Sequence, residues 1–503
     1  MLKKLVLVLA SIGCLAAIFF LGRYTAMQKL QQQAIVSTSV DETIVSKYMT
    51  DAVTTGIEKM FTGDTREVKP GELIMDAVRA ANPGDTILVH PGSYHETIYI
   101  DKDAIRLRGV IKNGERATLD GKKTLNDAIL YSGNHIIVEN FKITAYKGNG
   151  IMGQAGNNFE IRNNLIVDTG VYGIFPQLGK NGVVEYNVLS GIEDAAIYVG
   201  MSDNIHVAHN EVFENVAGIE IENSRHAIVE NNLVYNNAGG ILAFVTPGLP
   251  IKTAEDIIIR NNFVTRNNHV NFAPEGSTVA GIPSGTGILV MAADQVVIER
   301  NIISDNKVAG ILITDHAHAS NITADPESEP NADEFRIFSN QMHNNGYDTI
   351  AEIKALATLE LNSGLIDIVA VGPSNHSCIN DKHEYRTVGL ASTPACSHQT
   401  TAAIKSYLLP EPAAARVIPE GEQGKITFLG VCSGCHSYEG RLIGPSIASI
   451  QEIYKDNPIG LAHYLQNPVK KRPDYPEMPP QDYLPEKTRM AVAEYLLSIK
   501  KTY

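Results

Sequence analysis

The pentapeptide Ile136-Ile-Val-Glu-Asn140 decides the fold, because versions of it recur along the middle of the chain. Each version is a short apolar, mostly β-branched run that leads into Asn, as in Ile257-Ile-Ile-Arg-Asn-Asn262. The runs end at Asn140, Asn164, Asn187, Asn210, Asn232, Asn262, Asn301 and Asn340, and the first four steps between them are 22–24 residues long. Strands of about four residues at this period exclude a helical repeat, which needs amphipathic stretches of about ten residues or more.

A second ladder, a small residue followed by Ile, keeps the same period. Its members are Gly150-Ile151, Gly173-Ile174, Ala196-Ile197, Gly218-Ile219, Gly240-Ile241, Gly287-Ile288 and Gly310-Ile311. A repeat this short buries its Ile and Val side chains only by stacking on its neighbours, so we predict a solenoid of parallel strands. The coils should rise by about 4.8 Å each. The recurrent Asn side chains should hydrogen-bond along the stack.

The two ladders, together with the opening Gly84-Asp-Thr-Ile-Leu-Val-His-Pro-Gly92-Ser-Tyr94, resemble the right-handed parallel β-helix family that includes pectate-lyase-like proteins. The resemblance implies a mostly β fold over residues 67–400. An amphipathic helix over residues 71–81 should cap the exposed end of the solenoid.

The residue after each ladder Ile should face outward, because side chains alternate along a strand. This column is largely apolar and reads Met152, Phe175, Tyr198, Glu220, Leu242, Leu289 and Leu312. Two explanations compete. Insertions at residues 245–256 and 270–285 could cover the column, most plainly beyond residue 240. Alternatively, Phe175 and Tyr198 could form a saccharide-binding shelf with Gln154, Gln177, Glu220 and Glu222.

The shelf would make the solenoid a carbohydrate-active enzyme of the lyase or epimerase kind. That chemistry needs a base and a positive group or metal that neutralises the substrate carboxylate. The outward column has no Lys or Arg, but Asp168, Tyr172, Glu193 and Asp194 could supply acid–base groups or Ca²⁺ ligands.

A third possibility is a metal-handling module. His316 and His318, with Asp315 and His343, could bind copper. The remaining pair of interest, His206 and His209, we expect at the surface.

Near the end of the chain, Cys432-Ser433-Gly434-Cys435-His436 has the spacing of a c-type haem attachment site. No second ligand pair supports a zinc site. Gly444-Pro445, Met478 in a proline-rich loop and an amphipathic helix near residues 486–499 follow in order. Residues 421–503 therefore resemble a monohaem class I cytochrome c, all-α in fold. The resemblance implies one covalent haem c on Cys432 and Cys435, with His436 and Met478 as axial ligands of the iron.

We accordingly expect one-electron transfer with redox partner proteins, and a β-helix that serves as a binding or docking scaffold, with polysaccharide as a possible partner. Whether the chain is also an enzyme with a substrate of its own stays open, with an electron carrier favoured. A net charge of −14 argues against nucleic acid as a partner.

The N-terminus carries Lys3 and Lys4 and then an apolar run from Leu5 to Leu21, which predicts an uncleaved membrane anchor over residues 1–26. A cleaved or lipidated leader is the alternative. Whether the segment is an anchor or a cleaved or lipidated leader, we expect the rest of the chain to be exported to a bacterial periplasm. The uncleaved anchor would lie in the inner membrane.

The other predicted segments are a helical spacer at residues 27–66 and a Pro-rich linker at residues 401–420. The linker should stay extended and leave the C-terminal part some freedom. Cys378 and Cys396 stand 18 residues apart in an exported protein, which favours a disulfide over two free thiols.

Overall fold

The computed structural model describes residues 54–274, 277–319, 322, 325–362, 364–397, 400–419, 421–475 and 477–500. The predicted anchor, and the predicted spacer as far as residue 53, lie outside these residues. The described end of the spacer is a short 3-10 helix, η2 (Ile57–Met60), after which the chain enters its first strand. In these ranges no helix combines the length and apolar character needed to cross a membrane.

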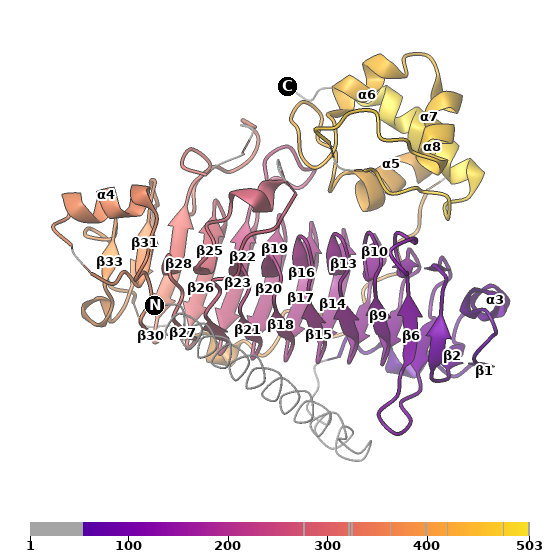
Figure 1. Ribbon diagram of the computed structural model, residues 1–503, viewed down its shortest axis with the longest axis horizontal. Coiled ribbons are helices and arrows are strands. Elements are labelled where there is room, and N and C mark those ends of the chain that lie inside the picture. Colours follow the sequence, from indigo (N-terminus) through magenta and orange to yellow (C-terminus); the bar gives the residue numbers. More distant parts are fainter. Residues whose placement is uncertain are drawn as a thin grey trace, which may run out of the picture. The chain divides into compact units, whose positions relative to one another are not determined.

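Over the described residues the chain winds into coils whose strands form three parallel sheets, named A, B and C (Figure 1). Sheet A contains β1 (Thr65–Val68), β2 (Thr86–Val89), β5 (Arg106–Gly109), β8 (Ile136–Glu139), β11 (Phe159–Arg162), β14 (Lys180–Glu185), β17 (Asp203–Ala208), β20 (Arg225–Glu230), β23 (Glu255–Arg260), β26 (Asp294–Glu299), β29 (Arg336–Phe338) and β32 (Cys378–Ile379). Sheet B contains β3 (Gly92–Tyr94), β6 (Ala117–Asp120), β9 (Lys142–Thr144), β12 (Leu165–Val167), β15 (Val188–Ser190), β18 (Glu211–Phe213), β21 (Leu233–Tyr235), β24 (Phe263–Thr265), β27 (Ile302–Ser304) and β30 (Gln341–His343). Sheet C contains β4 (Ile98–Ile100), β7 (Ile129–Tyr131), β10 (Ile151–Gln154), β13 (Tyr172–Gln177), β16 (Ala195–Gly200), β19 (Ala217–Glu222), β22 (Gly239–Phe244), β25 (Thr286–Met291), β28 (Ala309–Thr314), β31 (Ile368–Ala370) and β33 (Thr387–Val388).

The helices stand outside the coils. They are α3 (Ile74–Ala80), η3 (Thr278–Gly281), α4 (Ala351–Leu359), η4 (Lys382–Glu384), η5 (Thr401–Ala403), α5 (Gln423–Thr427), the π-helix η6 (Phe428–Cys432), α6 (Ile447–Ile453), α7 (Pro458–Gln466) and α8 (Glu486–Ser498). The predicted cap helix is present as α3, which packs its buried Ile74 and Val78 into the same core as the first coils.

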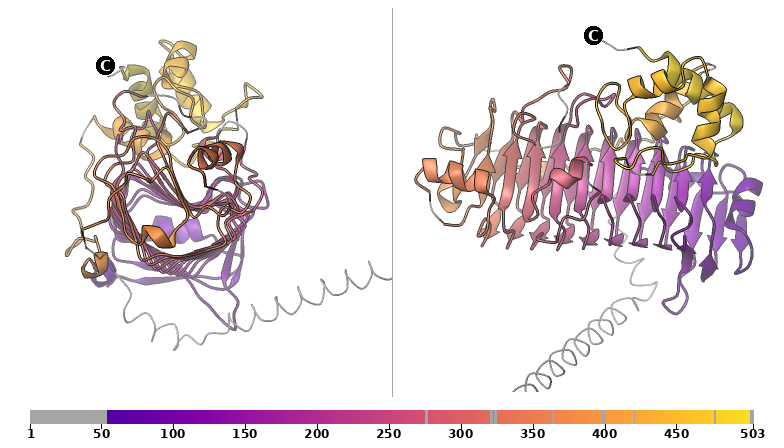
Figure 2. Two further views of the ribbon diagram at one scale, coloured as in Figure 1. Left: turned by 90° about the vertical axis from the view of Figure 1, so that its left-hand side faces the viewer. Right: turned by 45° about the horizontal axis from the view of Figure 1, so that its top comes forward.

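Both predicted ladders build the core. The Ile side chains of sheet C stack in register, with Ile151 opposite Ile174 and Ile197 opposite Ile219, and all four are fully buried. Viewed along the stack, successive coils superimpose (Figure 2). Because equivalent residues of successive coils lie directly above one another, each short strand can bury its apolar side chains against those of the next coil.

The predicted hydrogen bonding between Asn side chains is confirmed. Asn187 donates from its Nδ2 to the Oδ1 of Asn210 at 3.0 Å, and Asn210 does the same to Asn232. Each Oδ1 also accepts a backbone N–H of the coil before, such as that of Asn187. A second such ladder, at the turn from sheet B to sheet C, runs through Asn215 and Asn237. The amide side chains thereby provide hydrogen-bond partners for buried backbone N–H and C=O groups that would otherwise have none in these tight turns.

Sheet A carries a row of buried charges on its outer face. Arg162 lies 2.8 Å from Glu185, and Arg260 lies 2.6 Å from Glu230. His206, which we expected at the surface, is 1% exposed and lies 3.2 Å from Glu230. The prediction failed because later parts of the chain cover this face. His209 is exposed, as expected.

The segment after the last coil runs back along sheet A. Thr401 contacts Glu299 and Arg260, and further on the chain reaches progressively earlier coils. The N–H groups of Leu409, Ala413 and Arg416 donate in turn to the Oδ1 atoms of Asn181, Asn158 and Asn134, at 2.7–2.9 Å. We name residues 400–416 the return segment.

The return segment corrects one expectation about the linker. It begins with η5, and after η5 it contains neither helix nor strand; its bonds to the coils contradict the expected freedom of the C-terminal part. The amide oxygens of Asn134 and Asn158 each accept one hydrogen bond within the coils and have a second lone pair left, which the return segment uses. The side chain of Arg416 adds bonds to the carbonyl groups of Ala155 and Leu178 at 2.8 and 2.9 Å.

The C-terminal residues form a small helical part with a core of its own. Phe428, Leu461, Leu465, Val492 and Leu496 are buried together there. Helix α8 packs against α5 and α7, and the apolar positions of the predicted helix near residues 486–499 supply the contact. In both views of Figure 2 this helical part lies beside the strands of the β-helix, where the hydrogen bonds described below place it.

Candidate active site

The outward column of sheet C is buried, so neither a bare shelf nor an exposed stripe is present. Met152, Phe175, Tyr198 and Leu242 are exposed by 6, 4, 2 and 1%. Beyond residue 240 the cover is the predicted one: the insertion at residues 270–285 contributes Val279 and Ile282 to the same core. The expected cover by insertions is confirmed there.

Over the earlier coils the cover comes from the C-terminal helical part, which the sequence did not reveal. Gln154 donates to the hydroxyl of Tyr483 at 2.6 Å. Gln177 donates to the carbonyl of Leu429 at 3.2 Å and to the hydroxyl of Ser433 at 3.3 Å. Gln154 and Gln177 are therefore buried beneath protein groups and do not form an exposed saccharide shelf, although their Oε1 atoms have no hydrogen-bond partner among the described residues.

Three acids remain beneath this cover. Asp194 directly precedes β16, while Glu220 and Glu222 lie in β19, the neighbouring strand of sheet C. The register sets Tyr198 opposite Glu220 and Gly200 opposite Glu222, so both glutamates point outward on one coil beside Asp194 on the previous one. We call Asp194, Glu220 and Glu222 the acid cluster. They are 7, 1 and 6% exposed.

Within the described ranges, none of the three acids of the cluster forms an ion pair of the kind that normally accompanies buried carboxylates. Glu222 accepts a hydrogen bond from the hydroxyl of Thr246. Among the described residues, neither Oδ1 of Asp194 nor Oε1 of Glu220 has a hydrogen-bond partner. A buried acid without a partner is costly to ionise, which makes it a candidate functional group.

Burial therefore dominates the acid–base behaviour of the cluster. It raises the pKa of Asp194 to about 8, and the nearby charge of Glu222 acts in the same direction. Burial raises the pKa of Glu222 to about 7, against the opposing hydrogen bond from Thr246. The pKa of Glu220 lies well above its ordinary value, again through burial and then through Asp194.

Aromatic rings line the floor beside the acids. Tyr172 stacks on Tyr198 with ring centroids 4.5 Å apart, and Phe175 meets both rings at 4.6 Å. Burial raises the pKa of Tyr172 well above its ordinary value, so its hydroxyl stays protonated.

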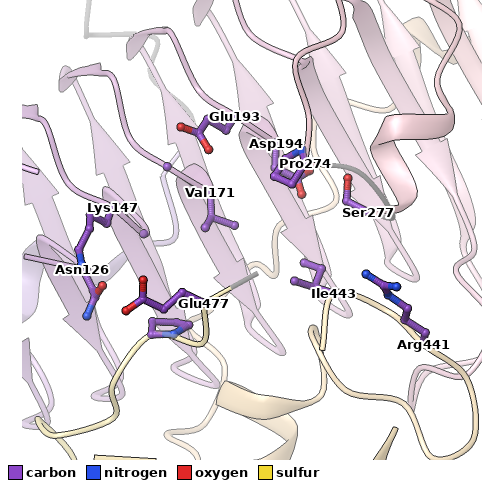
Figure 3. A pocket seen from close by; sticks show the side chains of 13 residues that line it. Asn126, Lys147, Val171, Glu193, Asp194, Pro274, Ser277, Arg441, Ile443 and Glu477 are labelled. Carbon is purple, nitrogen blue, oxygen red and sulfur yellow. The ribbon is translucent and has the colours of Figure 1, made fainter. Parts of the chain in front are cut away.

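Asp194 also lines a cavity of about 270 Å³, whose lining does not include Glu220 or Glu222 (Figure 3). All three acids border a narrow space of about 20 Å³. Lys147 and Glu193 border it from the turns of the β-helix, while Arg441 and Glu477 border it from loops of the C-terminal helical part. Arg441 is partly held elsewhere, since its guanidinium lies 4.4 Å above the ring of Tyr475. The cavity thus combines a buried acid with both signs of charge at its border.

Sequence reasoning named Asp194, Glu193, Glu220 and Glu222 but missed Lys147, Arg441 and Glu477. Arg441 and Glu477 are more than 200 residues away from Asp194 in the chain. No local motif marks them, because they meet the acids only through the docking of the helical part. Of the other predicted acid–base residues, Tyr172 lies at the cluster, whereas Asp168 is exposed and pairs with Lys123 at 2.6 Å.

The packing around Cys432-Ser433-Gly434-Cys435-His436 contradicts the predicted haem c. Both thiols are free, and burial raises the pKa of each to about 12. In the ranges that the structure describes, no group of three or more His, Cys, Asp or Glu side chains could hold a metal ion.

The two predicted axial ligands lie in the C-terminal helical part. His436 is 9% exposed, and its Nδ1 donates to the carbonyl of Pro445 at 2.7 Å. Met478 packs, half-buried, against the core of the helical part. Electron transfer and redox partners were predicted from the haem. Because the haem prediction is contradicted, that basis for both predictions is lost.

The copper hypothesis finds no support either. His318 bonds to Asp315 through its Nδ1 at 2.7 Å, but His316 turns its Nε2 to the carbonyl of Val245 at 2.8 Å. His343 lies in β30 on sheet B, and these side chains form no metal-binding group within the described ranges. Cys378 and Cys396 do meet, and they form a disulfide.

Comparison with known proteins agrees with the fold. Residues 110–247 match the family model described as a right handed beta helix region. None of the curated proteins matches the chain. Similar solved structures include the A-module of the mannuronan C-5 epimerase AlgE4 of Azotobacter vinelandii, with 17% identity, 65% of this chain and 92% of that chain covered, and a TM-score of 0.43.

Two further structures are similar at the same distant level. An alginate lyase from a Paenibacillus species has 14% identity, covers 57% of this chain and 99% of its own, and has a TM-score of 0.40. The DFA-IIIase of Arthrobacter chlorophenolicus has 13% identity, covers 67% and 99%, and has a TM-score of 0.41. The chain thus contains a right-handed β-helix region.

Proposed function

We propose that this protein is a carbohydrate-active enzyme of the β-helix type, and that its acid–base groups are the acid cluster on sheet C. One observation carries the proposal: Asp194 is buried, its Oδ1 has no partner among the described residues, and it lines a cavity of about 270 Å³. Structural carboxylates are normally paired, so an unpaired one at a cavity is better explained by a ligand.

Burial raises the pKa of all three acids. Asp194, with a pKa of about 8, borders the 270 Å³ cavity and can donate a proton to a leaving oxygen at neutral pH. We assign the proton-accepting role to Glu222, which interacts electrostatically with Asp194. A pair of neighbouring acids is the usual equipment for cleaving or rearranging a saccharide.

The border of the cavity suits a polar, ring-shaped substrate. Lys147 and Arg441 offer positive charge and hydrogen-bond donors, and Glu193 and Glu477 offer acceptors for hydroxyl groups. Positive groups near the reacting carbon are what a lyase or epimerase needs when its substrate carries a carboxylate. A polymer of uronate sugars, such as alginate, is therefore the first substrate to test.

We also propose that the enzyme works outside the cytoplasm, as its apolar N-terminal run suggests. A disulfide between Cys378 and Cys396 supports this, because disulfides persist in oxidising compartments.

The test is to incubate the full-length protein with alginate, polygalacturonate and fructan. Hydrolysis is read as new reducing ends, elimination as the ultraviolet absorbance of an unsaturated uronate, and epimerisation as uptake of deuterium from the solvent. We expect one of these products with the unchanged protein. Asp194→Asn and Glu222→Gln should each lower the rate by about 100-fold or more.

The matched control is Glu214→Gln, an exposed acid on the turn after β18, which should leave the rate unchanged. If the folded protein acts on none of these polymers, or if both cluster variants keep full activity, the proposal is wrong.

A further inference from the structure

A second cavity, larger than the first and mostly apolar, lies farther along sheet C. Its volume is about 590 Å³. Its floor consists of outward side chains on three consecutive coils, with Leu242 opposite Leu289 and Leu289 opposite Leu312. It shares no lining residue with the 270 Å³ cavity beside Asp194, but it shares Phe244, Thr278 and Val279 with the narrow space that the acid cluster borders.

The walls of this cavity come from segments that are distant in the chain. The insertion that contains η3 supplies Val279 and Ile282 on one side. Helix α4 supplies Ile353 and Leu356 on another. The β-helix needs neither segment to close its coils, yet together they enclose space instead of filling it.

An apolar cavity of this size is unusual in a packed protein, because side chains normally fill such volumes. Cavities of about 300–1,000 Å³ with apolar walls and a few polar groups are typical of small-molecule sites. Two of the polar groups here, His318 and Glu352, are exposed and mark the rim, and the Nδ1 of His318 is held by Asp315 at 2.7 Å.

We propose that this cavity binds a single uncharged aliphatic molecule, a straight-chain alcohol in chemical class. The chain lies along the Leu242–Leu289–Leu312 floor, and its hydroxyl group lies at the rim, where Glu352 can accept a hydrogen bond without a clash of charges. The aliphatic floor would leave most hydroxyl groups of a saccharide without partners, so this ligand differs in chemical class from the proposed substrate.

The experiment is a fluorescence titration of the full-length protein with a long-chain alcohol that carries a fluorescent group, followed by displacement with unlabelled alcohols from octanol to hexadecanol and with the matching fatty acids, which should bind more weakly because their carboxylate meets Glu352 at the rim. Affinity should rise roughly fourfold for each added methylene until the cavity is full. Leu356→Trp projects a ring into the cavity from α4 and should weaken binding about tenfold or more.

The control is Leu359→Trp on the same helix, at a position that is 82% exposed, and it should bind like the unchanged protein. Ala319→Phe fills the cavity from a different segment and should also weaken binding, and circular dichroism of each variant shows whether it folds. Absence of binding, an unchanged affinity in both filling variants, or an equal loss in the control would overturn the proposal.

Discussion

Replacing Asp194 by Asn should stabilise the protein while it abolishes activity, and the gain in stability should grow with pH. The amide has nearly the shape of the carboxylic acid but never ionises. In the folded chain the carboxyl group must ionise in a buried site without a cation, which is why burial moves its pKa from 3.8 to about 8. The variant avoids that cost.

The size and the sign of this change in the free energy of unfolding follow from the linkage between proton binding and folding. Because the pKa is higher in the folded than in the unfolded chain, the folded state holds its proton more tightly. The contribution to stability is fully present below the unfolded value of 3.8 and is lost as pH rises through about 8. A shift of about four pH units corresponds to a ceiling of roughly 6 kcal/mol. Local relaxation and water entry should reduce this to about 2 kcal/mol in practice.

The assay compares thermal midpoints of Asp194→Asn and the unchanged protein at pH 4, 6 and 9, at one scan rate because a chain of this size can unfold irreversibly. We expect no difference at pH 4 and a gain of a few degrees at pH 9. Glu214→Gln, which removes an exposed charge, controls for net charge. A gain that is absent, or equal at all three pH values, would refute the reasoning about a buried ionisable acid.

Three further predictions concern the stability of the coils and the binding of the return segment to them. Reducing the disulfide between Cys378 and Cys396 should cost roughly 3 kcal/mol in the chain-entropy model for a loop of 18 residues, seen as a lower unfolding midpoint in reductant. Asn210→Ala should lower the free energy of unfolding by about 2–4 kcal/mol, because it leaves buried hydrogen-bonding groups on both neighbouring coils without a partner. The control, Asn82→Ala at an exposed position in the turn before β2, should change the free energy of unfolding by less than about 0.5 kcal/mol. Arg416→Ala should make the return segment several-fold more sensitive to limited proteolysis, and an unchanged cleavage rate would show that its bonds to the β-helix contribute little.

The coils were predictable because their signals are local and repeated. Ile151, Ile174 and Ile197 recur at a fixed spacing, and stacking is the one arrangement that buries all of them. The Asn ladder was predictable from the same fixed spacing of residues. The cap helix was also predictable, since the open end of a solenoid needs a cover and residues 71–81 have the apolar spacing of one.

The site was only half predictable. Alternation along the strands identified Glu220 and Glu222 as outward residues, but it could not show what covers them. The cover depends on Gln154 meeting Tyr483, a pair that is 329 residues apart and has no sequence signal. The haem prediction failed for a related reason: the spacing of Cys432, Cys435 and His436 states which residues are near each other in the chain, but not whether the described residues around them form a metal-holding group.

The return segment has a consequence for how this protein can change in evolution. Solenoids ordinarily lengthen or shorten by gaining or losing whole repeats, since each coil contacts only its neighbours. Here Leu409, Ala413 and Arg416 are matched one by one to Asn181, Asn158 and Asn134. A coil added between residues 134 and 181 would move every later partner by about 4.8 Å and break the match. Duplication in this stretch therefore breaks these bonds unless the return segment straightens or lengthens in the same step, so changes in the number of coils here should come with changes in the return segment.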